Sequence, residues 1–329
     1  MKSIVTGGAG FIGSHLVRLL LSKGHELVVL DNFSTGRPEN LLDISHEITL
    51  IECDLSSVGA WVDAFIGADF VFHLAALADI VPSIQNPNAY FNANVVATFN
   101  VLTASRANTV KKFIYTASSS CYGTPTLYPT PETSAIQPEY PYALTKRIGE
   151  ELILHWAKVF QFPANSLRLF NVYGPRSRTS GTYGAVFGVF LAQKLAGQPL
   201  TVVGDGTQTR DFTYVSDVVN ALYAASQTSL VGEVFNVGSG SEVSINRLVE
   251  LLGSEQIHIP KRPAEPSRTF ADIGKITDQL GWTPQVGIVD GVNRLLDDIN
   301  YWKDAPVWTK DKIESATSDW FKYLARDGN

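Results

Sequence analysis

The sequence predicts an α/β fold in which a doubly wound parallel sheet carries helices on both faces and is joined to a smaller C-terminal α+β lobe. Short apolar strands alternate with helical stretches through the first half of the chain, an order that produces parallel βαβ units. A glycine-rich turn joins the first strand to the first helix. After Gly174 and Pro175 this alternation gives way to mixed turns, short strands and helices.

The elements follow from hydrophobic spacing. Apolar runs predict strands at 2–6, 26–31, 48–53, 70–74, 112–116 and 164–170. Helical spacing predicts helices at 14–23, at 94–106 with Val95, Phe99 and Leu102 on one face, and at 142–160. Residues 211–226 are also apolar and helical in pattern and are expected to return to the sheet.

These elements divide the chain into two expected domains. The sheet domain is expected at 1–173, with a return of about 213–238. The smaller lobe is expected at 174–212 and 239–329, ending in a Trp-rich amphipathic stretch that docks as a tail. A chain of 329 residues, 45% of them apolar, has enough material for two unequal cores.

Composition excludes several classes of protein. The net charge of -6 argues against a nucleic-acid partner, because phosphate backbones select basic proteins. There is no run of 18 apolar residues and no leader before the first strand, so we expect a cytoplasmic protein without a membrane segment. The two cysteines, Cys53 and Cys121, agree with a reducing compartment. The six histidines lack metal-ligand spacing, and we expect no metal site.

The glycine turn has the spacing of a dinucleotide site. Gly7 permits the tight turn, Gly10 lets the backbone approach a pyrophosphate, and Gly13 lets the helix pack on the strand. An isolated pattern of this kind is often a plain turn, but here Asp31 ends the second strand 18 residues after Gly13. Unless it is a solvated strand-end acid, Asp31 binds an adenosine ribose and repels a 2′-phosphate, which favours NAD over NADP.

A second pattern supplies acid–base chemistry. Tyr142 and Lys146 are spaced to share one helix face. A free phenol has a pKa of about 10, so base chemistry at neutral pH needs a fall of roughly 3 units, or about 4 kcal/mol. We expect the ammonium of Lys146 and the positive nicotinamide ring to supply much of it. Ser118, Ser119 and Ser120 follow a strand and should lie at the same sheet edge, where Ser118 can face Tyr142.

Six motifs give the chain a family resemblance. They are TGGAGFIG at 6–13, HLAA at 73–76, SSSCYG at 118–123, YALTK at 142–146, RLFNVYGPR at 168–176 and GDGTQTRDFTYVSD at 204–217. With these, the chain resembles the extended short-chain dehydrogenase/reductase family, with its Rossmann domain, and specifically the NAD-dependent nucleotide-sugar epimerase/dehydratase branch. The resemblance runs from Thr6 to about Pro284.

The resemblance implies roles for individual residues. Ser118, Tyr142 and Lys146 match the catalytic triad. The residues implied to bind NAD are Gly7, Gly10, Phe11, Ile12, Gly13, Asp31, Asn32, Ser34, Thr35, Gly36, Asp54, Leu55, Leu74, Ala75, Ala76, Tyr142 and Lys146. Those implied to bind a UDP-sugar in the second lobe and at the sheet edge are Ser119, Ser120, Asn171, Val186, Thr201, Arg210, Arg262, Glu265 and Thr269.

Within that second set, Arg210 and Arg262 match the arginines that clamp the diphosphate, and Glu265 matches a ribose-binding acid. Relatives of this kind pair through two helices, which implies a homodimer formed by 94–106 and 142–160. Outside these sets, His73 is expected to be a satisfied strand-end residue, and Cys121 to be a packing residue because its sequence neighbours are not cationic.

The resemblance also narrows the reaction. The 4,6-dehydratases of this branch carry Thr-Asp-Glu at 118–120, and its decarboxylases carry a Glu at 120, whereas this chain has three serines. What remains is 4-epimerisation through a transient 4-keto sugar. Thr269, at the position that gates the sugar pocket, is small, which favours UDP-GlcNAc and UDP-GalNAc or their uronic acids. A UDP-glucose/UDP-galactose epimerase, a dehydratase, decarboxylase or reductase, and a non-catalytic dinucleotide sensor remain alternatives.

Overall fold

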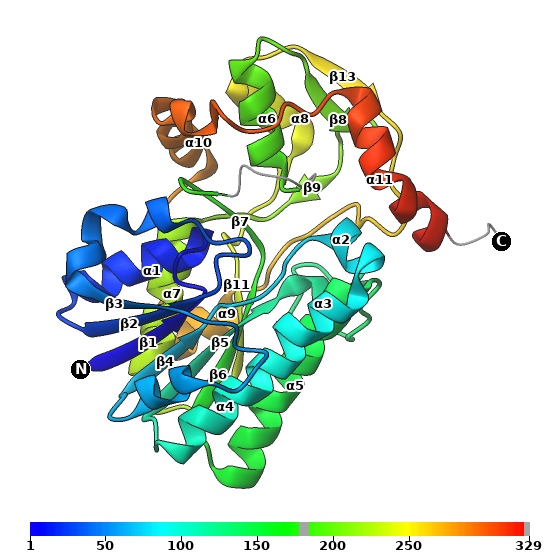
Figure 1. The fold of residues 1–329 in the computed structure, drawn as a ribbon. Helices are drawn as coiled ribbons and strands as arrows, with labels where there is room; N and C mark the ends of the chain where they lie inside the picture. Colours follow the sequence, from blue (N-terminus) through cyan, green and yellow to red (C-terminus); the bar gives the residue numbers. More distant parts are fainter. Residues whose placement is uncertain (178–183, 326–329) are drawn as a thin grey trace.

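A seven-stranded parallel sheet forms the centre of the molecule in this computed structural model, which describes residues 1–177 and 184–325 (Figure 1). The strand order is β3-β2-β1-β4-β5-β6-β11. The strands are β1 (Lys2–Thr6), β2 (Glu26–Asp31), β3 (Ile48–Glu52), β4 (Phe70–His73), β5 (Lys112–Ser118), β6 (Ala164–Leu169) and β11 (Val234–Val237). β1 pairs with β2 on one side and with β4 on the other, so the strand order reverses between β1 and β4. In such sheets, ligands bind in the crevice at the carboxyl ends of the two strands where the order reverses.

The predicted doubly wound sheet is therefore confirmed; β3, β4 and β6 each end one residue before the predicted limit, and two larger differences occur. β5 extends two residues beyond the predicted 112–116, so that Ser118 is the last residue of the strand. β11, which was not predicted, pairs with β6 and closes one edge. Its four residues are too few to stand out from the surrounding apolar segments.

Helices cover both faces of the sheet (Figure 1). On one face α1 (Phe11–Ser22) packs against α7 (Val215–Gln227). On the other face lie α4 (Ala97–Ala107) and α5 (Pro141–Phe160), preceded by α2 (Ile80–Gln85), α3 (Pro87–Phe91) and a π-helical turn at Asn92–Val96. Each helical layer buries its own apolar cluster against the sheet.

The predicted helices need three corrections. The first begins at Phe11 and not at residue 14, because Gly10 is its N-cap. The helix predicted at 211–226 begins only at Val215, because residues 212–214 form β10 and pair with β7. Phe99, predicted to share an apolar face with Val95 and Leu102, is 46% exposed and packs edge-on against Trp156 of α5, whereas the other two are buried.

A second group of elements lies over the carboxyl ends of the strands (Figure 1). It has its own apolar cluster, centred on Tyr173, Phe190 and Trp302. Its helices are α6 (Val186–Leu195), α8 (Ile245–Leu252), α10 (Ile288–Asp297) and α11 (Lys310–Leu324). Its short strands are β7 (Asn171–Tyr173), β8 (Leu200–Val203), β9 (Thr209–Arg210), β10 (Phe212–Tyr214), β12 (Val243–Ser244) and β13 (Gln256–Ile259), while α9 (Gly274–Leu280) packs on β11.

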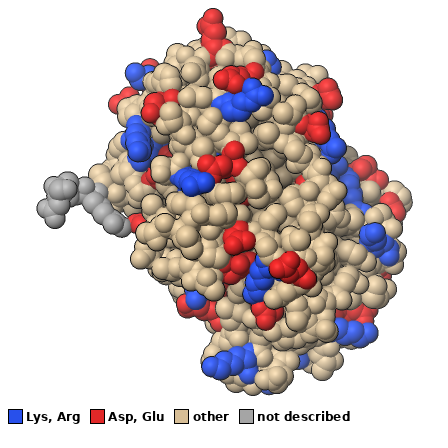
Figure 2. Space-filling view, turned by 180° about the vertical axis from the view of Figure 1, so that it is seen from behind, with Lys and Arg blue, Asp and Glu red and all other residues tan. Residues whose placement is uncertain are grey.

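The exact domain limits proposed from the sequence stay a prediction. Among the described residues no helix is both long enough and apolar enough to cross a membrane. On the face drawn in Figure 2, acidic and basic side chains are interspersed. That face therefore presents no large area of a single charge.

Candidate active site

One cavity of about 680 Å³ lies between the carboxyl ends of the sheet strands and the second group of elements. Every residue that the sequence implied for coenzyme or substrate binding lines it, from Gly7 to Thr269, with the exception of Lys146. Residues that are far apart in the chain thus meet at the crevice that the strand order creates.

The glycine turn at the start of α1 forms one end of this cavity. Gly7 has a φ of +69°, and a Cβ there would lie 2.7 Å from the backbone nitrogen of Ala75. A Cβ at Gly13 would overlap the carbonyl oxygen of Gly7. Gly10 caps α1 with no side-chain hydrogen bond, so the first N–H groups of the helix, at Phe11 and Ile12, have no acceptor within the helix and lie at the cavity wall. Such a helix start fits a pyrophosphate.

Asp31 lies beside this turn at the end of β2. Its carboxylate accepts hydrogen bonds from the backbone N–H groups of Ala9 (2.9 Å) and Phe33 (2.8 Å). Burial raises the pKa of the carboxyl, and these hydrogen bonds oppose the shift. Asp31 is therefore not a solvated strand-end acid but a fixed acceptor at the cavity wall, which fits a ribose diol. The glycine turn and Asp31 together fit a dinucleotide.

Tyr142, near the start of α5, lies in the middle of the cavity lining with Ser118. Ser118 hydrogen-bonds to the phenol of Tyr142 and, at 2.8 Å, to the hydroxyl of Ser120. Burial raises the pKa of Tyr142, the Ser118 hydrogen bond lowers it in part, and the negative charge of Asp79 raises it further. With the groups of the protein alone, the pKa of Tyr142 therefore does not fall as the sequence led us to expect, because the effect of desolvation exceeds that of the Ser118 hydrogen bond.

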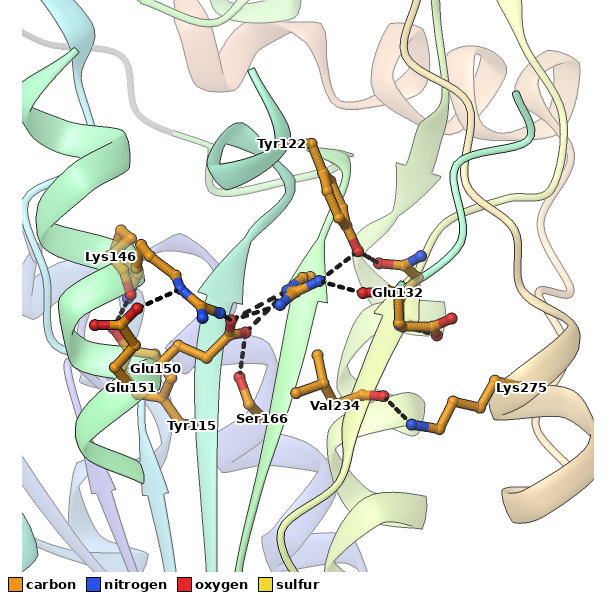
Figure 3. A network of polar contacts seen from close by, with 12 residues as sticks. Tyr115, Tyr122, Glu132, Lys146, Glu150, Glu151, Ser166, Val234 and Lys275 are labelled. Atoms are coloured by element: carbon orange, nitrogen blue, oxygen red, sulfur yellow. Dashed lines mark hydrogen bonds and ion pairs between the residues drawn. The ribbon is translucent and has the colours of Figure 1, made fainter. Parts of the chain in front are cut away.

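Lys146 lies one turn further along α5 and is buried, outside the cavity lining. Its Nζ is 4.3 Å from the centroid of the Tyr115 ring, and the Tyr115 hydroxyl donates to the Lys146 carbonyl at 3.2 Å (Figure 3). This approach requires Gly149, since a Cβ there would overlap the Tyr115 hydroxyl. Burial lowers the pKa of the Lys146 ammonium to about 7, against the opposing effect of Glu150. The ammonium expected from the sequence is thus disfavoured by burial and supported by the carboxylate of Glu150.

A buried ionic network lies under this part of α5 (Figure 3). Glu150 accepts hydrogen bonds from Arg168 Nη2 at 2.7 Å and Nε at 3.0 Å, and from the hydroxyl of Ser166 at 2.9 Å. Arg168 also donates to the hydroxyl of Tyr122 at 2.7 Å. Although burial alone would raise it, the pKa of Glu150 stays below its usual value because of Arg168. A negative charge is thus held four residues after Lys146.

The other end of the cavity carries the predicted substrate residues. Arg210 Nη2 donates to Glu265 Oε1 at 2.9 Å, and Arg262 Nη1 lies 3.7 Å from Glu265 Oε2. That second oxygen is buried and has no hydrogen-bond partner among the described residues, so the ion pair with Arg262 balances its charge. The hydroxyl of Thr269 donates to Asn171 Oδ1 at 2.9 Å and so is part of the pocket wall.

A comparison with known proteins agrees with this geometry. Residues 3–238 match the model of the family described as NAD dependent epimerase/dehydratase.

The chain belongs to this family.

The description of the family confirms the prediction of NAD as coenzyme. Among relatives, the UDP-glucose 4-epimerase of Mycolicibacterium smegmatis is 35% identical over 307 residues, which are 90% of this chain and 98% of that protein. The UDP-glucuronic acid decarboxylase 1 of Arabidopsis thaliana is 34% identical over 311 residues, 91% of this chain and 69% of that protein.

Among solved structures, the UDP-N-acetylglucosamine 4-epimerase of Methanobrevibacter ruminantium M1, in complex with UDP-N-acetylmuramic acid, superimposes with a TM-score of 0.84. It is 31% identical, and the match covers 90% of this chain and 98% of that one. Nucleotide-sugar enzymes are thus similar to this chain over most of its length, and they differ among themselves in sugar and in reaction.

Several cavity residues of this family member were not found from the sequence. Tyr140 stacks on Tyr142 with ring centroids 6.3 Å apart, and its place two residues before Tyr142 was the available signal. Asp79, Trp308 and Trp320 also line the cavity. Nothing in the sequence signals them, because the folded chain brings them to the site from α2 and from the C-terminal segment.

His73 and Cys121, which were expected to have no catalytic or binding role, are both buried. His73 is fully buried with both ring nitrogens bonded, to Thr6 at 2.7 Å and Thr98 at 2.8 Å, which confirms it as a satisfied strand-end residue. Cys121 packs with Tyr122 and other apolar residues, and burial raises the pKa of its thiol to about 12. The expected packing role is confirmed; Arg168, which is distant in the sequence, lowers the pKa of the thiol, but burial outweighs its charge. Within the described residues no cluster of metal-ligating side chains occurs.

Proposed function

We propose that this family member is a nucleotide-sugar 4-epimerase that inverts C4 through a transient 4-keto sugar. The observation that carries the proposal is the group formed by Ser118, Tyr142 and the hydroxyls of Ser119 and Ser120, which share one cavity with the glycine turn. Hydroxyls at 119 and 120 leave these positions without the carboxyl acid and base that elimination needs. Redox at a single carbon requires only one proton acceptor and donor.

The chemistry divides between coenzyme and protein. When bound, NAD supplies the reversible acceptor for the hydrogen on C4 of the sugar. Tyr142 takes the proton of the 4-hydroxyl and later returns it, so that atoms and charge balance over the cycle. Ser118 hydrogen-bonds to the phenol of Tyr142 and lies where it can also donate to the sugar oxygen. Lys146 lies one helical turn away, where burial lowers the pKa of its ammonium and Glu150 opposes that shift.

Inversion also needs the sugar to turn over without leaving the site. Arg210 and Arg262 lie on either side of Glu265 and would hold the diphosphate as a tether. A tethered keto sugar can rotate about the diphosphate linkage and present its other face to the same catalytic groups. This explains why the substrate should be a nucleotide sugar and not a free sugar.

We further propose UDP-GlcNAc and UDP-GalNAc, or the corresponding uronic acids, as the substrates. Support comes from Thr269, whose hydroxyl is drawn to Asn171 and which leaves more room than a bulky side chain would. The structural similarity to a UDP-N-acetylglucosamine 4-epimerase agrees with this choice. UDP-glucose and UDP-galactose are the alternative, favoured by the similarity to a UDP-glucose 4-epimerase.

The test is to incubate the purified protein with UDP-GlcNAc, UDP-glucose and UDP-glucuronic acid and to follow H4 by proton NMR. We expect the C4 epimer of UDP-GlcNAc to appear fastest, without accumulation of NADH. Equal turnover of UDP-glucose would contradict the sugar assignment. Release of carbon dioxide or a dehydrated product would contradict epimerisation, and bound NAD without any turnover would favour a sensor.

We also propose that the protein is a cytoplasmic homodimer. Both cysteines are free thiols, as expected in a reducing compartment. Helices α3 to α5 expose large apolar side chains, namely Phe91, Phe99, Leu144, Val159 and Phe160. Two copies that pair α4 and α5 into a four-helix arrangement would cover this face. Light scattering of the purified protein should give twice the chain mass, and a monomer at micromolar concentration would contradict the dimer.

A further inference from the structure

The C-terminal helix α11 buries one face in the molecule. Ile313, Thr317 and Trp320 are spaced along that face and are at most 5% exposed. Of these three, Trp320 alone lines the cavity. The amphipathic tail predicted from the sequence is therefore docked, and it reaches the site at one residue of its buried face.

Trp320 contacts the segment that carries two of the predicted substrate residues. Its indole Nε1 donates to the carbonyl oxygen of Pro263 at 2.7 Å. The guanidinium of Arg262 lies 5.3 Å from the centroid of a Trp320 ring, a cation–π distance. Arg262 in turn lies beside Glu265, which also pairs with Arg210. Trp320 thus supports the loop that presents Arg262 and Glu265 to the cavity.

The same helix also contacts the opposite rim of the cavity. α11 packs against α2, and Asp319 Oδ2 accepts a hydrogen bond from Gln85 Nε2 at 2.9 Å. α2 starts directly after Asp79, and its first residues, Ile80 and Val81, line the cavity. Residues 319 and 320 therefore contact both the loop at 262–265 and the end of α2, whose first residues line the cavity.

The segment before α11 is fixed near the site as well. The carbonyl oxygen of Trp308 accepts a hydrogen bond from Gln193 Nε2 at 2.7 Å. The same amide nitrogen donates to the hydroxyl of Thr201 at 2.9 Å, and Thr201 is a predicted substrate residue. Ala305, Pro306 and Trp308 line the cavity next to it. The chain therefore borders the nucleotide end of the cavity at 305–308 and again at Trp320.

We propose that the segment 305–308 and Trp320 form a fixed wall of the nucleotide end and that Trp320 is a positioning residue, which holds Arg262 and Glu265 in place for the diphosphate and ribose. This inference rests on the proposed function, because it assumes a nucleoside diphosphate at that end. It assigns a role to a segment that supplies none of the catalytic residues. Since the coenzyme residues lie at the other end of the cavity, loss of Trp320 should weaken nucleotide-sugar binding and leave coenzyme binding unchanged.

The experiment titrates UDP into the NAD-loaded protein by calorimetry, with Trp320→Ala, Trp320→Phe and Tyr323→Ala as variants. Tyr323 lies on the same helix but is exposed, so Tyr323→Ala is the matched control. We expect Kd for UDP to rise about tenfold in Trp320→Ala, since a cation–π contact and a hydrogen bond are lost, and about threefold in Trp320→Phe, which keeps a ring but not the N–H donor. KM for the sugar nucleotide should rise in parallel while kcat and the bound NAD stay unchanged.

Each outcome decides between the proposals. Unchanged UDP affinity in a Trp320→Ala protein that still holds NAD would overturn the role of Trp320. If that variant does not fold, unchanged UDP affinity in Trp320→Phe would overturn the role of Trp320 in the same way. Gln85→Ala, which removes the hydrogen bond between α2 and Asp319, should raise Kd for UDP about twofold. Failure of the unaltered protein to bind UDP would instead overturn the proposed function itself.

Discussion

The buried carboxylate of Glu150 offers the sharpest prediction about stability. Its side chain is 1% exposed and is bonded to Arg168, Arg147 and Ser166. Glu150→Gln keeps the shape but leaves the buried guanidinium of Arg168 without its counter-charge. Breaking a buried pair from one side costs about 3–5 kcal/mol. With a urea dependence of about 3 kcal/mol per molar, the unfolding midpoint should fall by roughly 1–1.7 M.

The matched control is Glu151→Gln, one residue along the same helix. Glu151 also pairs with Arg147, at 3.0 Å, but its side chain is 58% exposed, so at most about 1 kcal/mol should be lost. The pKa of Glu150 is lowered in the folded state, so its stabilisation is present above the ordinary glutamate pKa of about 4.3 and is lost as the pH falls through the lower folded value. Urea unfolding of the variants and of the unaltered protein, at pH 7 and at acidic pH, measures the loss of stability and its dependence on pH. Equal losses in the two variants at pH 7 would refute the reasoning.

The remaining predictions concern catalysis and the coenzyme. Tyr142→Phe should reduce the rate of epimerisation about 10²–10⁴-fold and leave NAD bound. A rate close to that of the unaltered protein would show that the phenol of Tyr142 does not transfer the proton of the 4-hydroxyl. Asp79→Asn removes a negative charge that raises the pKa of Tyr142, so that pKa should fall and the acid limb of the kcat/KM profile should move to lower pH; a shift to higher pH would contradict the placement of Asp79. Gly13→Ala puts a Cβ against the carbonyl of Gly7 and should abolish coenzyme binding, measured by release of NAD on denaturation, whereas Gly24→Ala, at an open turn, should retain the coenzyme.

Local patterns were enough to predict most of the sheet and the coenzyme end of the cavity. The strands are short apolar runs, Gly7, Gly10 and Gly13 act through backbone geometry that their spacing reveals, and the place of Asp31 at the end of the second strand reveals its carboxylate. β10 was missed because three residues inside an apolar segment carry no period of their own, and the helix predicted there was drawn too long.

The electrostatics of the site could not be predicted in the same way. Tyr142 and Lys146 are adjacent on one helix face, and their spacing suggested a phenol activated by an ammonium. The pKa values depend mainly on burial, with further effects of the charges of Asp79 on Tyr142 and of Glu150 on Lys146. Burial and the approach of Asp79 come from the packing of separate segments, which spacing along the chain does not encode.

The most direct test of the proposed reaction follows the fate of the C4 hydrogen. The protein is incubated with UDP-GlcNAc in D₂O, and the recovered C4 epimers are examined by proton NMR and mass spectrometry. If Tyr142 exchanges only the hydroxyl proton and C4 is oxidised and reduced within one binding event, the inverted sugar keeps protium at C4 and gains no carbon-bound deuterium. Deuterium at C4 or C5 would contradict that mechanism.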